Sequence, residues 1–343
     1  MTMDHEPSTM NPGVTMQGAG TEYGVDIDDI RAAAQRIAPH AQVTPVLTCR
    51  TLDQIAGRRL YFKCENFQRI GAFKFRGACN AIMGLADDVA ARGVVTHSSG
   101  NHAQAVALAA KLRGMPAHIV MPRNSVAVKK RAVIGYGATV YECEPTEQSR
   151  HEVGDRVAKD TGATFISPFD DPRIIAGQGT SALELIEQSR ASGGLDGIIA
   201  PIGGGGLMSG TAIAFAAAAP RAGIFGAEPT GADDAARSLA AGEFIPQTDP
   251  RTIADGLRTS TGAYTWPIIR DHVQRIFTVS EEEIVRAMRL VWERMKIIIE
   301  PSAAVPLAAL LLGRIDTAGK RTGIILSGGN VDLNETLRLF GEG

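Results

Sequence analysis

Residues 197–219 read GIIAPIGGGGLMSGTAIAFAAAA, and this stretch decides the class of fold. An apolar run rich in isoleucine is followed by four consecutive glycines at 203–206 and then by an alanine-rich segment typical of a helix. A strand, a tight glycine turn and a helix in this order make up half of a βαβ unit. Because strands joined through such crossovers run parallel, the stretch predicts a parallel sheet covered by helices.

The same alternation of strand and helix patterns extends in both directions from this stretch. The strand-like runs are RLYFKCE (59–65), GVVTH (93–97), AHIVMP (117–122), TVYECE (139–144) and ATFISP (163–168). The helical patterns between them include AFKFRGACNAIMGL (72–85), NHAQAVALAAKLRG (101–114) and TSALELIEQS (180–189). Two helix starts are well marked, one at Asp26 and one at a capping box of Ser280 with Glu283. We therefore expect an α/β protein.

Length and composition limit what such a protein can be. At 343 residues the chain is long enough for two lobes, and a net charge of -2 with a pI near 6.4 offers no basic surface for nucleic acid or anionic lipid. The longest uncharged apolar stretch, residues 212–219, is too short to span a bilayer. We therefore expect a small-molecule partner, no nucleic acid and no membrane.

Two features indicate the compartment. The N-terminal segment contains acidic residues, prolines and glycines but neither the basic nor the apolar region of a signal peptide, so we expect residues 1–24 to form a disordered tail. The four cysteines, at positions 49, 64, 79 and 143, show no CxxC spacing and lack the density of a secreted disulfide scaffold. Reduced thiols in a cytoplasmic protein without structural zinc are the expectation.

Three glycine-bearing segments each follow a strand pattern and open a helix pattern: SSGNHAQA (98–105), IGGGGLMSG (202–210) and LSGGNVDL (326–333). Such turns lie together at the carboxyl edge of a parallel sheet, which is where ligands bind. We therefore expect the three segments to share one ligand.

The glycines at 203–206 are typical of a phosphate-binding loop, in which backbone N–H groups converge on an anion at a helix N-terminus. A plain tight turn would not need four residues with so large a loss of backbone entropy. A dinucleotide site is a second interpretation, since Glu228 ends the next strand where a ribose-binding acid would lie. Its spacing fails, because a GxGxxG count from Gly204 puts Ser209 in the last glycine position. A nicotinamide-dependent oxidoreductase is thus the remote alternative.

Lys74 lies between Phe73 and Phe75 in GAFKFRGACN (71–80), an apolar setting in which an ammonium group is costly. One interpretation is a lysine whose amine reaches out to water. Together with a phosphate loop and the strand-end serine Ser327, the lysine instead predicts pyridoxal phosphate, whose aldehyde requires an amine. The two phenylalanines would hold that amine in a low-dielectric place where it is neutral.

As an ordered set, the motifs GAFKFRGA, SSGNHAQA, GGGGL, AEPTGADDA and LSGGN resemble the fold type II pyridoxal phosphate enzymes, which include threonine dehydratase, serine dehydratase and serine racemase. The resemblance covers about residues 25–340. It implies a two-lobed fold like that of the tryptophan synthase β chain. The large cofactor-binding domain would comprise residues 25–82 and 168–343, and a small mobile domain would comprise residues 83–167.

The resemblance also assigns a cofactor site. Lys74 would be the Schiff-base lysine, with Phe73 beside it. The remaining cofactor residues would be Gly203, Gly204, Gly205, Gly206 and Leu207 for the phosphate, Asn101 for the ring hydroxyl and Ser327 for the pyridine nitrogen. A neutral hydroxyl at that nitrogen leaves the ring unprotonated, which suits elimination better than transamination.

The substrate carboxylate would be received on amides at a helix start, in the loop of Ser98, Ser99, Gly100, Asn101 and His102. For His102, a packed histidine that contacts nothing reactive is an equal alternative. Ser99 stands where biosynthetic threonine dehydratases typically read alanine. A hydroxyl on the face opposite Lys74 resembles the branch of serine racemases and 3-hydroxyaspartate dehydratases, and a serine that only caps the helix is the other interpretation.

The implied activity is that of a pyridoxal phosphate-dependent ammonia-lyase. Lys74 takes the α-proton, and the β-hydroxyl leaves with proton assistance from the cofactor phosphate. L-Serine would give pyruvate and L-threonine would give 2-oxobutanoate, each with ammonia. Serine racemase with a dehydratase side activity and threo-3-hydroxyaspartate ammonia-lyase are the alternatives. A non-catalytic homologue would need a broken lysine or phosphate loop, and both are intact.

The resemblance further implies a divalent cation bound by Glu228, the carbonyl of Ala232 and Asp234, within AEPTGADDA (227–235). Hard oxygen ligands favour magnesium, manganese or calcium over zinc. Such an ion would be structural and not catalytic. The alternative is that Asp233 or Asp234 caps the following helix. A homodimer is also implied, while a nucleotide effector is left open.

Overall fold

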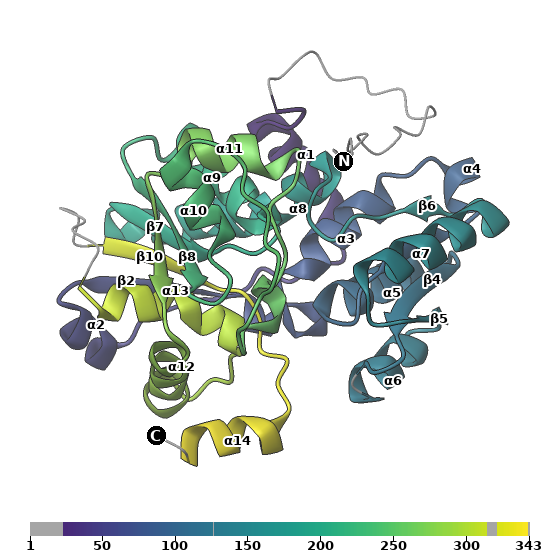
Figure 1. The fold of residues 1–343 in the computed structure, drawn as a ribbon. Coiled ribbons are helices and arrows are strands. Elements are labelled where there is room, and N and C mark those ends of the chain that lie inside the picture. Colours follow the sequence, from purple (N-terminus) through teal and green to yellow (C-terminus); the bar gives the residue numbers. More distant parts are fainter. Residues whose placement is uncertain (1–22, 126, 314–320, 342–343) are drawn as a thin grey trace.

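The computed structural model describes residues 23–125, 127–313 and 321–341 (Figure 1). Its strands form two separate sheets, one of six strands and one of four, and helices cover both. The expected α/β class is therefore confirmed. Of the tail expected at residues 1–24, all but Tyr23 and Gly24 lies outside the described residues.

The six-stranded sheet has the strand order β1-β2-β10-β7-β8-β9. Its strands are β1 (Val46–Leu47), β2 (Arg59–Cys64), β7 (Gly197–Pro201), β8 (Gly223–Pro229), β9 (Arg275–Val279) and β10 (Arg321–Leu326). All neighbours run parallel except the edge strand β1, which pairs antiparallel with β2. The strands β2, β10 and β7 are buried on both faces, which explains their almost uninterrupted apolar sequences.

Helices pack on both faces of this sheet. One face carries α1 (Ile27–Ile37), α8 (Pro172–Ser189), α9 (Gly206–Ala218), α10 (Asp234–Ala241) and α11 (Thr265–His272). The other carries α2 (Arg50–Ala56), α12 (Glu281–Met295) and α13 (Pro301–Leu311), with α14 (Leu333–Gly341) against α12. The short 3₁₀ turns are η1 (Glu65–Phe67), η2 (Arg69–Gly71), η3 (Arg190–Ser192) and η4 (Asp255–Leu257).

The four-stranded sheet is parallel throughout and has the strand order β5-β4-β3-β6. Its strands are β3 (Val94–His97), β4 (Ala117–Pro122), β5 (Thr139–Cys143) and β6 (Thr164–Phe165). The helices around it are α4 (Asp87–Ala90), α5 (Asn101–Arg113), α6 (Ala127–Gly135) and α7 (Glu147–Thr161). The helix α3 (Lys74–Met83) packs against both α5 and α8, so it connects the two sheets.

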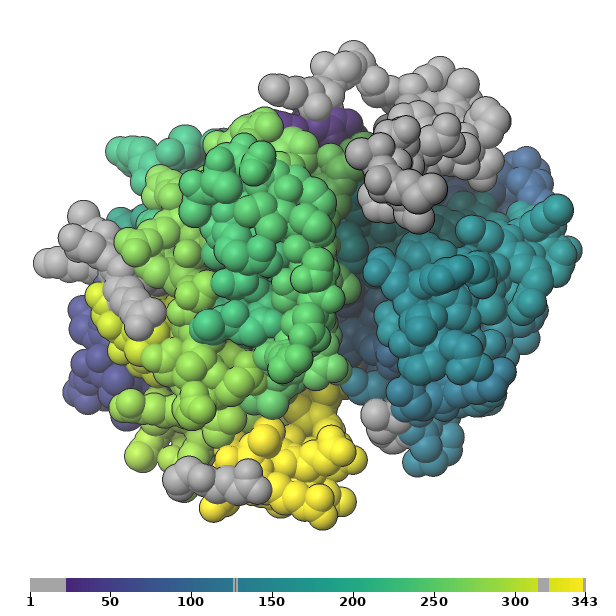
Figure 2. Space-filling model, viewed as in Figure 1, coloured from purple at the N-terminus to yellow at the C-terminus, as the bar shows by residue number. Residues whose placement is uncertain are grey.

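Figure 2 shows two bodies with a groove between them, one blue to teal and one green to yellow. The strands of the four-stranded sheet all lie within residues 83–167, and those of the six-stranded sheet lie outside that range. The division into a large domain of residues 25–82 and 168–343 and a small mobile domain of residues 83–167 stays a prediction. Among the described residues, no helix combines the length and the apolar character needed to cross a membrane.

The helix starts show where local sequence was sufficient. Asp26 caps α1 with a capping box, and Ser280 with Glu283 forms the expected box at α12. The helix expected at residues 180–189 begins earlier, at Pro172, and contains Gly177 within it. A Cβ at Gly177 would come within 2.6 Å of the Cα of Gly77, so this glycine lets α8 approach α3 closely and does not break the helix.

Candidate active site

The glycine loop at residues 203–206 connects β7 to the N-terminus of α9, as expected. Gly205 has a φ of +88°, a region that favours glycine, and a Cβ at Gly204 would come within 2.2 Å of the Phe169 ring. Within the described chain, no backbone hydrogen bond is donated by the amides of residues 203–207, and no side chain caps α9. Free amides at a helix N-terminus fit a phosphate group.

Lys74 is the first residue of α3, and its Nζ donates a hydrogen bond to the carbonyl of Pro168 at 2.6 Å. The Nζ also lies 5.2 Å from the centre of the Phe73 ring. Burial lowers the pKa of Lys74 to about 8, although the charge of Glu300 opposes the shift. Phe75 does not flank the amine as expected, because α3 directs it into the hydrophobic core beside α5.

Ser327 follows β10 and lies next to the segment that leads into α3. Its carbonyl accepts a hydrogen bond from the amide of Phe73 at 3.0 Å, and Ala72 forms an isolated bridge with Gly328. The Ser327 side chain is largely buried. Its hydroxyl can serve as the hydrogen-bond partner of a ring nitrogen that a ligand brings.

Asn101 begins α5, and its side chain joins the two sheets. Its Nδ2 donates to both carboxylate oxygens of Glu300 at 3.1 Å, and its Oδ1 accepts from the Nδ2 of Asn330 at 2.9 Å. Glu300 is the residue before α13, and burial, followed by the charge of Asp255, raises its pKa to about 7.

Sequence reasoning assigned no role to Glu300 or Asn330. The available signal for Glu300 was a single carboxylate in an otherwise apolar stretch, directly before a proline that marks a helix start. Asn330 lay within a quoted motif, but only the structure shows that its side chain bonds to Asn101.

The sequence led us to expect the three glycine-bearing turns at one sheet edge. The structure shows that they do not share one. The segment at 98–105 follows β3 of the four-stranded sheet, whereas the segments at 202–210 and 326–333 follow β7 and β10 of the six-stranded sheet. Two of the segments nevertheless meet, through the bond between Asn101 and Asn330. The candidate site therefore lies between the two bodies.

The profile of the family described as "Pyridoxal-phosphate dependent enzyme" matches residues 37–328. This chain belongs to that family. The cofactor is therefore pyridoxal phosphate, and the dinucleotide interpretation of the glycine loop is discarded. The free amides at residues 203–207, the Lys74 amine and the Ser327 hydroxyl fit its phosphate, its aldehyde and its ring nitrogen respectively.

The enzyme has relatives whose activities are named. It is 50% identical over 308 residues to beta-hydroxyaspartate dehydratase of Paracoccus denitrificans (strain Pd 1222), which covers 90% of this chain and 97% of that protein. It is 49% identical over 323 residues to serine racemase of Arabidopsis thaliana, covering 93% of this chain and 97% of the relative. The structure of maize serine racemase matches with a TM-score of 0.89 and 48% identity, covering 93% and 97% of the two chains.

In this pyridoxal phosphate enzyme, Ser99 does not cap α5. The residue at the N-cap is Gly100, so no side chain caps the helix. The hydroxyl of Ser99 has no hydrogen-bond partner within the described chain. The Oγ of Ser98 accepts a hydrogen bond from the amide of Gly100 at 3.2 Å. The structure thus removes the capping interpretation and leaves the Ser99 hydroxyl available.

His102 is buried on α5, and its Nε2 lies 3.2 Å from the carbonyl of Ile166. Because a carbonyl only accepts, Nε2 must carry the proton, which leaves Nδ1 as a buried acceptor without a partner in the described chain. Burial, with a contribution from Lys74, lowers the pKa of His102 to about 3, so the ring is neutral. This setting favours the packing interpretation of His102.

Glu228 and Asp234 are both fully buried, at the end of β8 and the start of α10. Glu228 accepts hydrogen bonds from the amides of Ala235 at 3.3 Å and Ala236 at 2.8 Å, so Glu228 caps α10 and neither expected aspartate does. Both Asp234 carboxylate oxygens are buried without a partner in the described chain. Burial raises the pKa of Asp234 to about 6.

Burial also raises the pKa of Glu228 well above its usual range, and the charge of Asp234 adds to that shift. No group of three His, Cys, Asp or Glu side chains that could hold a metal occurs among the described residues. A cation at this pair would therefore take backbone carbonyl and water oxygens as well. The carbonyl of Ala232, which accepts no hydrogen bond in the described chain, is placed in the same turn.

Proposed function

We propose that this enzyme is an ammonia-lyase acting on β-hydroxy amino acids of the L-serine and L-threonine type. The observation that carries the proposal is the partly buried amine of Lys74, whose pKa is lowered to about 8. Near that pH a large share of the amine is neutral, so it can bond to an aldehyde and take a proton from carbon. The similarity to a beta-hydroxyaspartate dehydratase and to serine racemases supports this substrate class.

Pyridoxal phosphate, when bound, supplies an electron sink next to the α-carbon of the substrate. The amides of residues 203–207 would hold its phosphate, Ser327 would face its ring nitrogen and Asn101 would reach its ring hydroxyl. Lys74 would hold the cofactor and, once the substrate amine has displaced it, take the α-proton. Ser98, with the amides at the start of α5, would bind the substrate carboxylate.

The test is to identify the lysine that holds the cofactor. We expect purified protein to absorb visible light and borohydride to fix a pyridoxyl group on Lys74, found by peptide mass spectrometry. Lys74→Ala should lose several orders of magnitude in turnover, because base and attachment point disappear together. Lys111→Ala, on the exposed face of α5, is the matched control. A label on another lysine, or full activity of Lys74→Ala, would sink the proposal.

Racemisation is a second candidate activity, and the free hydroxyl of Ser99 favours it. Racemisation requires a proton donor on the face opposite Lys74, whereas dehydration of an L-substrate requires only one base. Ser99→Ala should therefore abolish racemisation and D-serine dehydration while L-serine dehydration largely remains. Equal loss of all three activities would make Ser99 structural.

Assays with L-serine, D-serine, L-threonine and L-threo-3-hydroxyaspartate, scored for oxo acid and stereoisomer, rank the substrates.

We also propose a divalent cation, magnesium, manganese or calcium, at Glu228, Asp234 and the carbonyl of Ala232. The buried oxygens of Asp234 without partners support it, because uncompensated carboxylates are costly to bury. Glu228 and Asp234 provide hard oxygen ligands, and water would complete the set. The ion would stabilise the turn after β8.

The assembly belongs to the proposal as well. We propose a homodimer, following the family resemblance, with size-exclusion chromatography and light scattering as its check. The nucleotide effector stays a prediction, and its check is whether a nucleoside triphosphate changes the rate of L-serine dehydration.

A further inference from the structure

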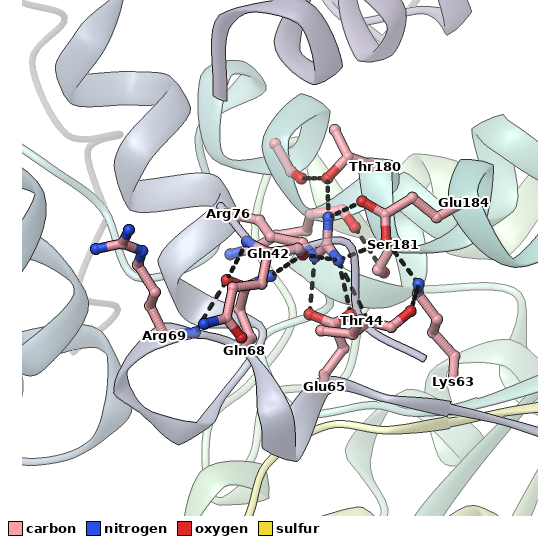
Figure 3. Close-up of polar contacts among 12 residues, drawn as sticks. Gln42, Thr44, Lys63, Glu65, Gln68, Arg69, Arg76, Thr180, Ser181 and Glu184 are labelled. Atoms are coloured by element: carbon pink, nitrogen blue, oxygen red, sulfur yellow. Dashed lines mark hydrogen bonds and ion pairs between the residues drawn. The ribbon is translucent and has the colours of Figure 1, made fainter. Parts of the chain in front are cut away.

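Four charged side chains lie together behind the first turn of α3 (Figure 3). Arg76, Glu65 and Lys63 have no exposed side-chain surface, and Glu184 retains 22%. We call these four residues the Arg76 network. Two positive and two negative charges balance, so the network as a whole carries no net charge.

The Arg76 guanidinium is bound from two sides. Its Nε and Nη2 donate to the two oxygens of Glu65 at 2.7 and 2.9 Å. Its Nη1 and Nη2 donate to the two oxygens of Glu184 at 2.7 and 2.8 Å, and Nη1 also reaches the Oγ1 of Thr180 at 3.1 Å. Two bidentate carboxylates fix the guanidinium plane as no single ion pair would. Lys63 donates to Glu184 at 2.6 Å and completes the network.

Arg76 is two residues beyond Lys74 in the same helical turn. Side chains two residues apart on an α-helix point to nearly opposite sides. Lys74 therefore reaches the Pro168 carbonyl, while Arg76 is held by η1 and α8. The amide of Arg76 donates to the carbonyl of Phe73 at 2.9 Å, which closes the turn between them.

The segment that leads into Lys74 has an unfavourable backbone conformation. Ile70 has a φ of +59°, which is costly for a β-branched residue and persists only where the surroundings enforce it. Glu65 begins this segment directly after β2, and Arg76 follows it, so their ion pair spans it. Gln68, within the segment, donates from Nε2 to the carbonyl of Gln42 at 2.7 Å.

We propose that Arg76 is a positioning residue for the reaction: its two bidentate ion pairs hold the first turn of α3 in place and so direct the Lys74 amine toward the cofactor. The inference rests on the proposed function of Lys74. Arg76 touches neither cofactor nor substrate in this arrangement. It acts through the backbone of residues 73–76.

The competing explanation is that the network only stabilises the fold, and a charge-balanced variant separates the two. Arg76→Met with Glu65→Gln removes one charge of each sign and leaves Lys63 paired with Glu184. The matched control is Arg321→Met with Asp196→Asn, which removes another two-bond ion pair at the end of β10 opposite Ser327. Unfolding in urea measures what each double variant costs in stability.

The decisive measurement is made on the protein freed of cofactor. Acylation of Lys74 is followed against pH by peptide mass spectrometry, which gives the pKa of this one amine. In wild type we expect about 8. In the Arg76 variant the first turn of α3 is no longer held, so the Lys74 amine should be more hydrated. Its pKa should therefore rise toward about 10. The control should keep the wild-type value.

Two further measurements test whether the Lys74 amine is less well held in the Arg76 variant. Capture of pyridoxal phosphate by the cofactor-free Arg76 variant should slow by at least about tenfold near pH 8, because less of its amine is neutral. The kcat for L-serine dehydration in reconstituted enzyme should fall about 100-fold, the order expected for a misplaced catalytic group. If the variant folds and keeps the wild-type pKa and capture rate, Arg76 is only structural and the proposal fails.

A variant that does not fold is replaced by Arg76→Lys, which keeps the charge but cannot bind two carboxylates with two bonds each. It should show the same rise in the Lys74 pKa, to a smaller extent, and an unchanged pKa overturns the proposal. Failure of the proposed function is distinguishable, since it appears as cofactor capture by Lys74→Ala. The amine titration needs no cofactor and judges Arg76 independently.

Discussion

The Arg76 network and the pair of Glu228 with Asp234 both bury carboxylates deeply, yet only the first gives all of them partners. In the network, Glu65 accepts two bonds from Arg76 and one from Thr44 at 2.6 Å. These interactions outweigh burial and lower the pKa of Glu65. In the acidic pair neither carboxylate forms an ion pair in the described chain, since Arg237 pairs with Asp233, and the pKa of both carboxyls is raised.

The difference shows how buried charge is used in two ways. A network that is neutral by itself can hold backbone in place without any ligand, which suits the region behind Lys74. An acidic pair without an ion-pair partner is costly to bury, so a cation that binds only the folded state would stabilise the protein there. Removing one charge should therefore destabilise the first cluster and relieve the second.

The largest effect is expected for Arg76→Met alone. The substitution leaves Glu65 buried and unpaired, and losing one partner of a buried ion pair costs about 3–5 kcal/mol. Urea unfolding of the cofactor-free protein measures the change. Arg31→Met, which breaks an exposed pair with Asp28, should cost about 0–1 kcal/mol. Similar losses at both positions would mean that the network contributes no more than a surface pair.

The second effect is the response to magnesium. After treatment with EDTA, added magnesium should raise the melting temperature, with about 2.7 kcal/mol of stabilisation at a concentration 100 times the dissociation constant. Asp234→Asn should remove the response. Asp233→Asn, which only breaks a surface pair with Arg237, should respond as wild type does. A melting temperature indifferent to magnesium, manganese and calcium would falsify the cation site.

A smaller effect of opposite sign is expected for Asp234→Asn in the absence of metal. The folded-state pKa of Asp234 is about 6, above its unfolded value, so the folded protein binds its proton more tightly and loses stability as pH rises from about 4 to 6. Above that window Asp234→Asn should be more stable than wild type by up to about 3 kcal/mol. Below it the two should converge.

The pH profile therefore distinguishes the two clusters. The lowered pKa of Glu65 works the other way: its contribution is present above pH about 4.5 and is lost as pH falls through the folded-state value. Urea unfolding of metal-free wild type and Asp234→Asn from pH 4 to 8 gives the difference curve. A curve that stays flat across the whole range contradicts an unpaired Asp234.

The smallest effect compares two buried threonines. Thr180→Val removes one neutral acceptor from Arg76 and should cost about 1 kcal/mol. Thr211→Val removes a buried hydroxyl that has no partner in the described chain, so it should be neutral or slightly stabilising. Equal costs at the two positions would show that the Thr180 contact adds nothing to the network.

Local features of the structure followed closely from the sequence. The capping box of Ser280 with Glu283 and the glycine turn before α9 depend on residues only a few positions apart. The helical pattern was expected to begin at residue 180, whereas α8 begins at Pro172 and contains Gly177. This glycine admits α3, and the packing partner lies at Gly77, which no local pattern identifies.

The candidate site divides in the same way. Lys74 and the glycine loop were proposed from sequence because each is unusual in its own surroundings. Glu300 was missed because its effect on the site depends on Asn101, almost 200 residues away, and on burial that the sequence does not state. The expectation of a single sheet edge was wrong because alternation of strand and helix does not say which strands pair.

By itself, then, the sequence determined the alternation of strands and helices, the glycine turn before α9 and a lysine in an apolar setting, since backbone preferences and residue chemistry are properties of short segments. Only the tertiary structure decided that Arg76 meets Glu65 and Glu184, and that the Asp234 oxygens are buried with no hydrogen-bond partner among the described residues. The cost of a buried charge depends on its neighbours in space, and those neighbours come from segments that only the folded chain brings together.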